Sequence, residues 1–345
     1  MHSPALRDRC RRTLPAVLAI ALLSACGPSA PPPSEPTPAK PASPAVSAFF
    51  ADFTDQWMQR QPEQATQSSY FEGTQQDALD GQLSPQTRAF RDETVALARE
   101  GLTRLATFER SAMSEAERVS AELMAWQLQA LVDRDRYADY SFPLNQFFGA
   151  NVRLPSLLTV VHPLRSARDA ENYLARLGQF EARMGEAVER AREQAQQGIL
   201  PPRFILDATI AQMQRFIGSE AAENPLVSTF AGKLQAIDEL DEAQRQQLVA
   251  EATRLVAEQV IPAWHAAIAE LEAQQASATD DAGLWRFPVG EAAYAQALYQ
   301  FTTTRLSAQE IHDIGLREVA RIEGEMDRIL SGLGRTEGSV KDRVA

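Results

Sequence analysis

The feature that most constrains the fold is a helical period of apolar residues, which begins near Ala48 and continues to the end of the chain. Phe49, Phe53 and Trp57 lie four residues apart, which places them on one face of a helix. Capping boxes, which start helices, recur as Ser114 with Glu117, Ser166 with Asp169, and Ser307 with Glu310. No segment alternates apolar and polar residues between hairpin turns. The sequence therefore predicts an elongated, all-α, multi-helix domain.

Proline and glycine divide this pattern into separate helices. Ser84 and Pro85 resemble an N-cap followed by proline at the first helical position. An apolar seam predicts one long helix over 167–197, which packs on a helix of this chain or on a coiled-coil partner. Other helices are expected at 203–218, 225–238, 241–274 with an interruption near Pro262, and from Ser307 to about Leu333. For residues 140–163 we expect a buried, irregular connection with at most a minor strand.

Residues 1–25 have the features of a bacterial signal peptide. Four arginines precede the apolar stretch Leu14–Leu23, which is too short to span a bilayer. The tetrapeptide Leu23-Ser24-Ala25-Cys26 then matches the lipobox pattern, so cleavage would leave a lipidated Cys26 at the N-terminus. The alternative is an ordinary secretory signal with an incidental cysteine. Cys10 would be removed with the signal, which leaves no thiol for a disulfide or a metal site in the domain.

The segment 26–47 predicts a disordered linker. It is rich in proline, alanine and serine, which favours an extended tether between the membrane and a helical domain over 48–345. Gly27, rather than aspartate, follows the cysteine, and this favours sorting to the outer membrane. We therefore expect an exported, lipid-anchored envelope protein that faces the periplasm.

The net charge of the chain limits its partners. Lys and Arg sum to 34 and Asp and Glu to 46, for a formal net charge of −12. Nucleic acid is therefore not expected as a partner, because its phosphates require a basic surface.

Sequence motifs that carry known chemistry are absent. The sequence has no H-E-x-x-H zinc motif, no G-x-S-x-G nucleophile elbow and no phosphate-binding P-loop. After the signal peptide, the histidines are His162, His265 and His312, and no two are spaced as metal ligands on one helix. We therefore assign no catalytic residue, no metal ligand and no cofactor to this chain.

Two segments, 143–149 and 283–294, are more distinctive than their surroundings. The second is a glycine-, aromatic- and proline-containing loop before a helix that carries Tyr294. Trp285 and Tyr294, with His312 on the next helix, are candidates to line a cleft, because flat aromatic faces bind ligands. The alternative is a structural loop in which Trp285 fills the core.

Four motifs follow the order of a bacterial family. They are P-L-N-Q at 143–146, G-L-W-x-x-P-x-G-E-x-x-Y at 283–294, T-T-T-x-L-S at 302–307 and E-I-H-x-I-G-L-x-E-V at 310–319. On these motifs the chain resembles the bacterial domain of unknown function family number 885, from about Ala48 to the last helix. Members of that family are often lipoproteins and look like helical zinc peptidases.

The resemblance implies that this chain corresponds to the N-terminal half of the family fold. Members are about twice as long and carry a His-Glu-x-x-Pro-Gly-His-His metal signature in their C-terminal half. This sequence has no His-Glu pair, so no metal ligand carries over, and zinc is expected only in full-length relatives. Residues 334–341 resemble the middle of a family member rather than a natural C-terminus.

Three functional hypotheses follow, and whether this chain is itself an enzyme stays open. In the first, it is the helical half of a lipid-anchored, peptidase-like protein, with Trp285, Tyr294 and His312 near a peptide substrate. In the second, it is a non-catalytic binding or scaffold lipoprotein with an envelope protein as partner. In the third, it is a truncated gene product that exposes apolar side chains of the last helix, namely Ile314, Leu316, Val319, Ile322 and Leu330.

Overall fold

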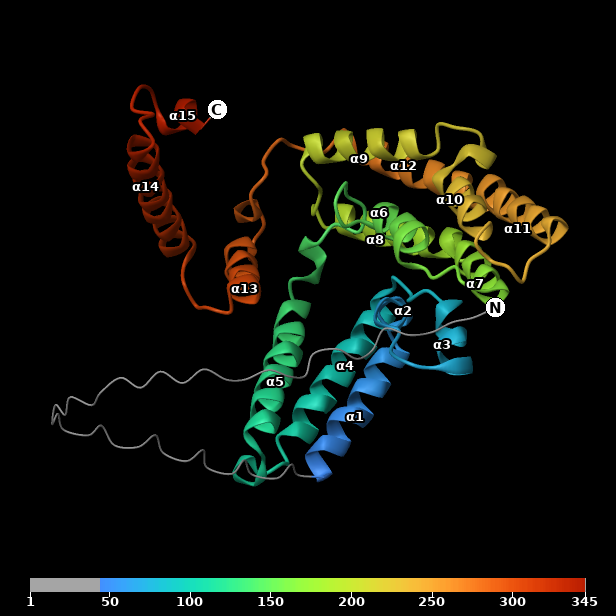
Figure 1. The fold of residues 1–345 in the computed structure, drawn as a ribbon, viewed down its shortest axis with the longest axis horizontal. Coiled ribbons are helices and arrows are strands. Elements are labelled where there is room, and N and C mark those ends of the chain that lie inside the picture. Colours follow the sequence, from blue (N-terminus) through green and yellow to red (C-terminus); the bar gives the residue numbers. More distant parts are fainter. Residues whose placement is uncertain (1–43, 345) are drawn as a thin grey trace, which may run out of the picture. The chain divides into compact units, whose positions relative to one another are not determined.

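The computed structural model describes residues 44–344, which form an all-α, multi-helix domain (Figure 1). None of these residues lies in a β-strand. They all belong to one structural unit, residues 40–345. Among them, no helix is both long enough and apolar enough to cross a membrane. The predicted signal peptide, Cys26 and most of the predicted linker lie outside the described residues.

The helices follow one another with short connections. The α-helices are α1 (Pro44–Gln59), α2 (Pro62–Ser68), α3 (Gly73–Asp80), α4 (Arg88–Leu105), α5 (Glu115–Asp135), α6 (Ala150–Ser156), α7 (Ala167–Leu177), α8 (Phe180–Gln196), α9 (Arg203–Phe216), α10 (Pro225–Leu234), α11 (Glu242–Leu255), α12 (Ile261–Gln275), α13 (Gly290–Thr302), α14 (Ala308–Gly332) and α15 (Val340–Val344). The 3₁₀ turns are η1 (Arg110–Ala112), η2 (Ala138–Tyr140), η4 (Ala221–Glu223) and η6 (Leu284–Arg286), and the π-helical turns are η3 (Leu157–Val161) and η5 (Val256–Val260).

The three predicted capping boxes are confirmed at the starts of α5, α7 and α14. The predicted cap at Ser84 is wrong. The side chain of Ser84 instead donates to Glu63 of α2 at 2.6 Å, and its backbone N–H donates to the same carboxylate at 2.7 Å. Helix α4 begins after Thr87, whose hydroxyl accepts the N–H of Phe90 at 3.2 Å. A competing tertiary contact therefore moved the helix start.

The single long helix predicted over 167–197 is also wrong, because the chain turns between α7 and α8. The N–H of Gly178 donates to the carbonyl of Leu174 at 2.9 Å, which closes α7. The side chain of Gln179 then accepts the N–H of Leu83 at 3.0 Å and donates to the carbonyl of Gly81 at 2.8 Å. The turn between α7 and α8 therefore binds the backbone of residues 81–83, a contact that sequence periodicity could not predict.

Residues 140–163 form α6 and η3 rather than a wholly irregular connection. Leu144, Leu154 and Leu158 are buried as expected, whereas Phe147 and Phe148 are exposed. The side chain of Asn145 accepts the N–H groups of both phenylalanines, at 2.9 and 2.8 Å. Such a turn is stabilised by bonds between the asparagine side chain and the backbone N–H groups. The two phenylalanine rings remain exposed to solvent.

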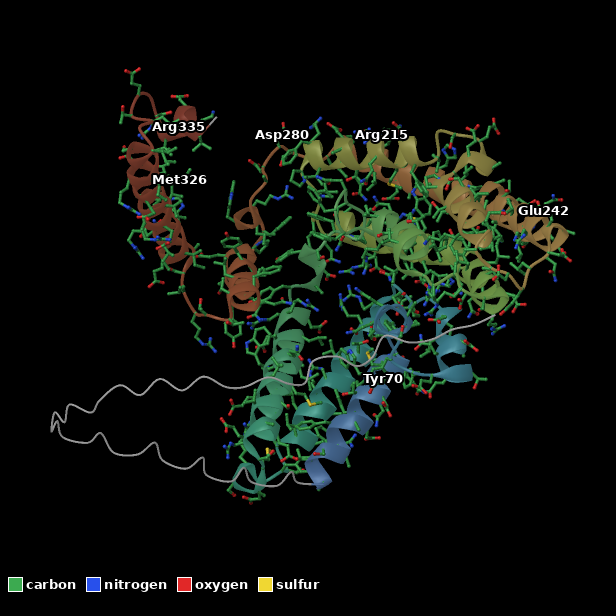
Figure 2. All side chains as sticks on the ribbon, viewed as in Figure 1. Tyr70, Arg215, Glu242, Asp280, Met326 and Arg335 are labelled. Carbon is green, nitrogen blue, oxygen red and sulfur yellow. The ribbon has the colours of Figure 1, made fainter. Side chains whose placement is uncertain are left out.

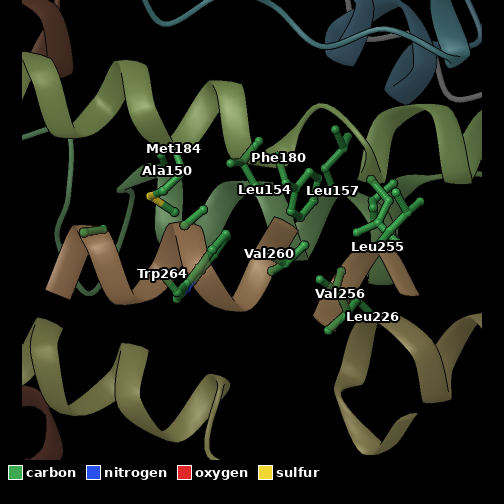
Figure 3. Packing of buried hydrophobic residues seen from close by; sticks show 14 of the residues in the cluster. Ala150, Leu154, Leu157, Phe180, Met184, Leu226, Leu255, Val256, Val260 and Trp264 are labelled. Atoms are coloured by element: carbon green, nitrogen blue, oxygen red, sulfur yellow. The ribbon is translucent and has the colours of Figure 1, made fainter. Parts of the chain in front are cut away.

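The larger hydrophobic core lies among α6 to α12. Trp264 of α12 is fully buried, with its ring centroid 6.2 Å from that of Phe180 and 5.2 Å from that of Phe216. Figure 3 shows Trp264 and Val260 near Phe180 and Met184 of α8. The predicted interruption near Pro262 is confirmed as the π turn η5 before α12. Proline lacks an N–H and crowds the carbonyl four residues earlier, which a widened turn relieves.

A second core joins α1, α4 and α5. The predicted face of α1 is confirmed, because Phe49 and Phe53 are buried and ring contacts link Phe49 to Phe53 and Phe53 to Trp57. A Cβ atom at Gly101 of α4 would lie only 2.5 Å from the ring of Phe53. Glycine therefore permits α1 and α4 to approach closely.

Candidate functional site

Residues 283–290 of the distinctive segment 283–294 form a loop that contains the 3₁₀ turn η6. Phe287 is buried and stacks on Tyr140, with ring centroids 4.9 Å apart and an interplanar angle of 6°. The guanidinium of Arg286 lies over the ring of Phe287, 4.5 Å from the ring centroid, and donates to the carbonyl of Leu200. A Cβ atom at Gly290 would lie 1.6 Å from the carbonyl oxygen of Leu284, so only glycine fits there. The loop is therefore anchored by Phe287.

Trp285 lies on this anchored loop, and its side chain is 71% exposed. The alternative in which Trp285 fills the core is therefore wrong, since Phe287 does so instead. Tyr294 on α13 is 48% exposed. The same helix is held against α5 by a ring contact between Tyr299 and Trp126, whose centroids lie 6.2 Å apart. Trp285 and Tyr294 are therefore exposed aromatic side chains on elements that pack against the rest of the domain.

The next helix, α14, which contains Met326 (Figure 2), has apolar side chains that are exposed. The exposed apolar side chains of α14, together with that of Leu333 directly after its last residue, are Ile314, Leu316, Val319, Ile322, Ile329 and Leu333. Most are spaced by three, four or seven residues, which puts them on one side of the helix. The expected exposure of Leu330 is wrong: it is buried, and α15 packs against α14. We call the six exposed side chains, without Leu330, the α14 apolar face.

His312 lies near the start of α14 and is exposed. Glu310, the third residue of α14, accepts hydrogen bonds from the N–H and the hydroxyl of the N-cap residue Ser307, both at 2.7 Å. These bonds lower the pKa of Glu310, so it remains ionised at the positive end of the helix dipole. The capping box therefore fixes the turn that carries His312.

His162 is buried in a polar network that sequence reasoning missed. Its Nδ1 accepts a hydrogen bond from Arg176 at 3.1 Å, and its Nε2 donates to the carbonyl of Asp169 at 2.9 Å. Burial is the main cause that lowers the pKa of His162 to about 4, and the positive charge of Arg176 adds to it. The imidazole is thus neutral, and both of its nitrogens are engaged within the protein.

Arg176 of α7 is the centre of this network and is fully buried. Its guanidinium also donates to the carbonyl of Gln82 at 2.9 Å, to the hydroxyl of Thr66 at 2.6 Å and to the carbonyl of Leu79 at 3.1 Å. The hydroxyl of Thr66 in turn donates to the buried carboxylate of Asp80 at 2.6 Å. Arg176 therefore ties α2 and α3 to α7. These partners lie about a hundred residues away in sequence, so no local pattern predicts them.

A zinc site of the family type does not fit the described residues. His162 has no free nitrogen for a metal, and His265 and His312 are exposed on different helices, α12 and α14. Within residues 44–344, no group of three or more His, Cys, Asp or Glu side chains is arranged to hold a metal ion. Among the described residues, the exposed side chains of Trp285 and Tyr294 and the α14 apolar face are the candidate binding surfaces.

The described residues thus form an all-α domain that carries exposed aromatic side chains on η6 and α13 and exposed aliphatic side chains on α14. The chain belongs to the family of bacterial proteins of unknown function called DUF885, whose model matches residues 62–345. The expected family membership is therefore confirmed. No curated protein sequence matches the chain.

Two solved structures are similar to this chain, and each is described as a putative lipoprotein. The Colwellia psychrerythraea protein is 23% identical with a TM-score of 0.79, over 87% of this chain and 53% of the other. The Shewanella oneidensis protein, whose description adds that its function is unknown, is 18% identical with a TM-score of 0.55, over 84% and 48%. At these identities the likeness shows the fold alone. This chain spans about half the length of either protein.

Proposed function

We propose that this chain is the helical part of an envelope lipoprotein and that it provides one wall of a peptide-binding cleft. Trp285 and Tyr294 contact the peptide, and His312 lies at the edge of the same wall. In the longer relatives, the opposite wall is supplied by sequence outside this chain. The observation that carries the proposal is the exposure of Trp285 on a loop whose neighbouring side chains are tightly anchored.

The exposed indole of Trp285, held on an anchored loop, is available to contact a ligand. Large apolar side chains that stay in solvent lose the stabilisation that burial would give. Tryptophan and tyrosine are also enriched among the few residues that dominate binding energy at interfaces. Because Phe287 and Gly290 fix the loop in the free protein, Trp285 pays little ordering entropy when it binds. This preorganisation supports a binding role.

The α14 apolar face supports the second part of the proposal. Contiguous apolar surface on a soluble domain commonly marks an interaction site. The solved relatives are about twice as long as the region that they share with this chain. We infer that the additional half of such proteins covers the α14 apolar face and closes the cleft.

Zinc chemistry, if it operates in the family, resides outside these residues. The resemblance to zinc peptidases implies a metal that polarises the peptide bond and activates water. The residues described here supply no ligand set for it, so their part is to bind and orient the peptide. This division of labour is consistent with a cleft built from two halves.

The envelope location rests on the N-terminal sequence and on the relatives. The lipobox at 23–26 predicts a lipid anchor at Cys26, and the two similar structures are described as lipoproteins. We propose attachment to the outer membrane, facing the periplasm, where unfolded polypeptides and peptides are accessible substrates.

A second candidate function is a non-catalytic scaffold that binds a folded envelope protein. The observation that favours it is the size of the α14 apolar face, which runs along a helix of 25 residues. A folded partner would contact this face along its length, whereas an extended peptide requires mainly Trp285 and Tyr294. The two candidates therefore predict different effects of substitution.

Binding of an unfolded polypeptide tests the proposal. Fluorescein-labelled reduced casein is expected to bind saturably, with an increase in fluorescence anisotropy. Trp285→Ala is expected to weaken binding about tenfold, because truncating one aromatic anchor commonly costs 1–2 kcal/mol or more. Tyr294→Ala is expected to act in the same direction.

The matched control is Phe204→Ala on α9, which truncates another half-exposed aromatic side chain. It should leave the affinity for casein within a factor of two. Circular dichroism should show equal helicity in the three variants, since each side chain lies at the surface. Casein binding that is equally strong in Trp285→Ala and wild-type protein would contradict the peptide-binding wall.

A further inference from the structure

Arginine side chains from α4 and α8 converge on the short turn η2. Arg88 Nη2 and Arg91 Nη1 each lie 3.5 Å from a carboxylate oxygen of Asp139. Arg190 Nη2 of α8 donates to the carbonyl of Ala138 at 2.6 Å. The two ion pairs are longer than a normal hydrogen bond, so Asp139 only loosely compensates Arg88 and Arg91.

Arg153 of α6 joins this group. Its Nη2 donates to the side chain of Gln86 at 2.8 Å, two residues before Arg88. Burial, followed by the positive charges of Arg91, Arg88 and Arg153, lowers the pKa of Arg190. The guanidinium groups of Arg88, Arg91 and Arg153 therefore each lie close enough to Arg190 to repel its charge. We call Arg88, Arg91, Arg153 and Arg190 the arginine cluster.

The arginine cluster is incompletely compensated. Asp92, Asp135 and Asp139 are the carboxylates paired with it, so four positive charges meet three negative ones. Arg91 Nε lies 3.1 Å from Asp135 Oδ1 and 3.8 Å from Asp92 Oδ1, so this side chain is ion-paired. Nε of Arg190, in contrast, is buried without a hydrogen-bond partner. Donors without acceptors in a half-buried site are costly unless a ligand satisfies them.

The position of the cluster on α4 adds to this imbalance. Arg88 is the first residue of α4, and the first turn of that helix contains no acidic residue. The N-terminal end of a helix carries partial positive charge, so a cation there is unfavourable and an anion is favourable. Glu186 does not compensate, because it accepts hydrogen bonds from Arg183 at 2.8 Å and from the N–H of Gln86 at 2.6 Å.

We propose that the arginine cluster binds a phosphate group. A guanidinium fork bonds phosphate oxygens in a planar, bidentate geometry, and a phosphate anion would neutralise the excess positive charge of the cluster. In a chain with a net charge of −12, such a basic site is a local exception. The phosphate belongs either to a small soluble ester or to an anionic lipid headgroup.

Calorimetric titration of the full chain in detergent tests this site, with two soluble probes that separate the sources. Inorganic pyrophosphate represents the free ligand, and dihexanoyl phosphatidylglycerol, kept below its micelle concentration, represents the headgroup. We expect saturable binding of at least one probe, weakened at least tenfold in the double variant Arg88→Gln/Arg153→Gln. Both side chains are exposed, so the variant should fold.

The matched control is Arg168→Gln on α7, which removes another exposed arginine. It should leave the affinity unchanged, and raising the salt concentration should weaken binding to the cluster. Tighter binding of phosphatidylglycerol than of pyrophosphate assigns the site to a headgroup, and the reverse assigns it to a soluble ester. Absence of saturable binding by both probes overturns the proposal, as does equal weakening in Arg168→Gln.

Discussion

Replacing Arg176 with methionine is expected to lower the free energy of unfolding by about 3–5 kcal/mol, the range found when one partner of a buried charged network is removed. Methionine fills similar space but cannot donate to His162, Thr66 or the carbonyl of Gln82. The buried carboxylate of Asp80 would also lose the nearby positive charge. Urea unfolding monitored by circular dichroism measures the effect.

Arg168→Met is the matched control for this variant. Arg168 lies on the same helix, α7, but is exposed and pairs only with Glu171, three residues away at 2.9 Å. Exposed pairs contribute little, so the control should change stability by less than about 0.5 kcal/mol. A loss below about 1 kcal/mol in Arg176→Met would contradict the view that this residue ties α2 and α3 to α7.

The protein is expected to lose about 2 kcal/mol of stability between pH 7 and pH 5 because of His162 alone. Burial lowers the pKa of this residue to about 4 in the folded state, whereas it is about 6.5 in the unfolded chain. As the pH falls through 6.5, the unfolded chain takes up a proton that the folded protein does not, so unfolding becomes easier. Above pH 7 the stabilisation is fully present, and below about pH 4 the loss from this group ends.

Urea unfolding at pH 7, 6 and 5 measures this dependence, and His162→Gln isolates it. Glutamine cannot titrate, so the variant should have lower stability at pH 7 but a smaller loss on acidification. His265→Gln is the control, because His265 is exposed on α12. An equal pH-dependent loss in His162→Gln and wild-type protein would contradict the assignment.

Local sequence signals predicted the helices well where side chains act on their own backbone. The capping boxes at Ser114, Ser166 and Ser307 are all formed, because each involves only residues three positions apart. Ser84 failed as a cap because Glu63, which lies in another helix, binds it more favourably. A local pattern therefore predicts the start of a helix correctly unless a residue distant in sequence binds the same side chain.

Burial was harder to predict from composition. The sequence singled out Trp285 in the loop, but it does not show that Phe287 provides the anchor, because the partner Tyr140 is far away in sequence. Phe147 and Phe148 are exposed although their segment is rich in apolar residues. Aromatic density indicates an unusual segment, whereas only the packing partners decide which ring is buried.

The candidate sites, too, could be predicted from the sequence only where their residues lie close together in the chain. The aromatic residues Trp285 and Tyr294 could be proposed from the sequence because their motif is compact. The arginine cluster could not, since Arg88, Arg153 and Arg190 come from three helices and carry no shared motif. The same holds for Arg176 and His162, whose contacts depend on how α2, α3 and α7 meet.

Photo-crosslinking tests the peptide-binding wall most directly. The photoreactive residue p-benzoyl-phenylalanine is placed at position 285 or 294, and at position 204 as a control on α9. Illumination with reduced casein should give crosslinked product at positions 285 and 294 but not at 204, and unlabelled casein should compete. Crosslinking that is equal at all three positions, or absent at 285 and 294, would contradict the proposal that this surface binds peptide.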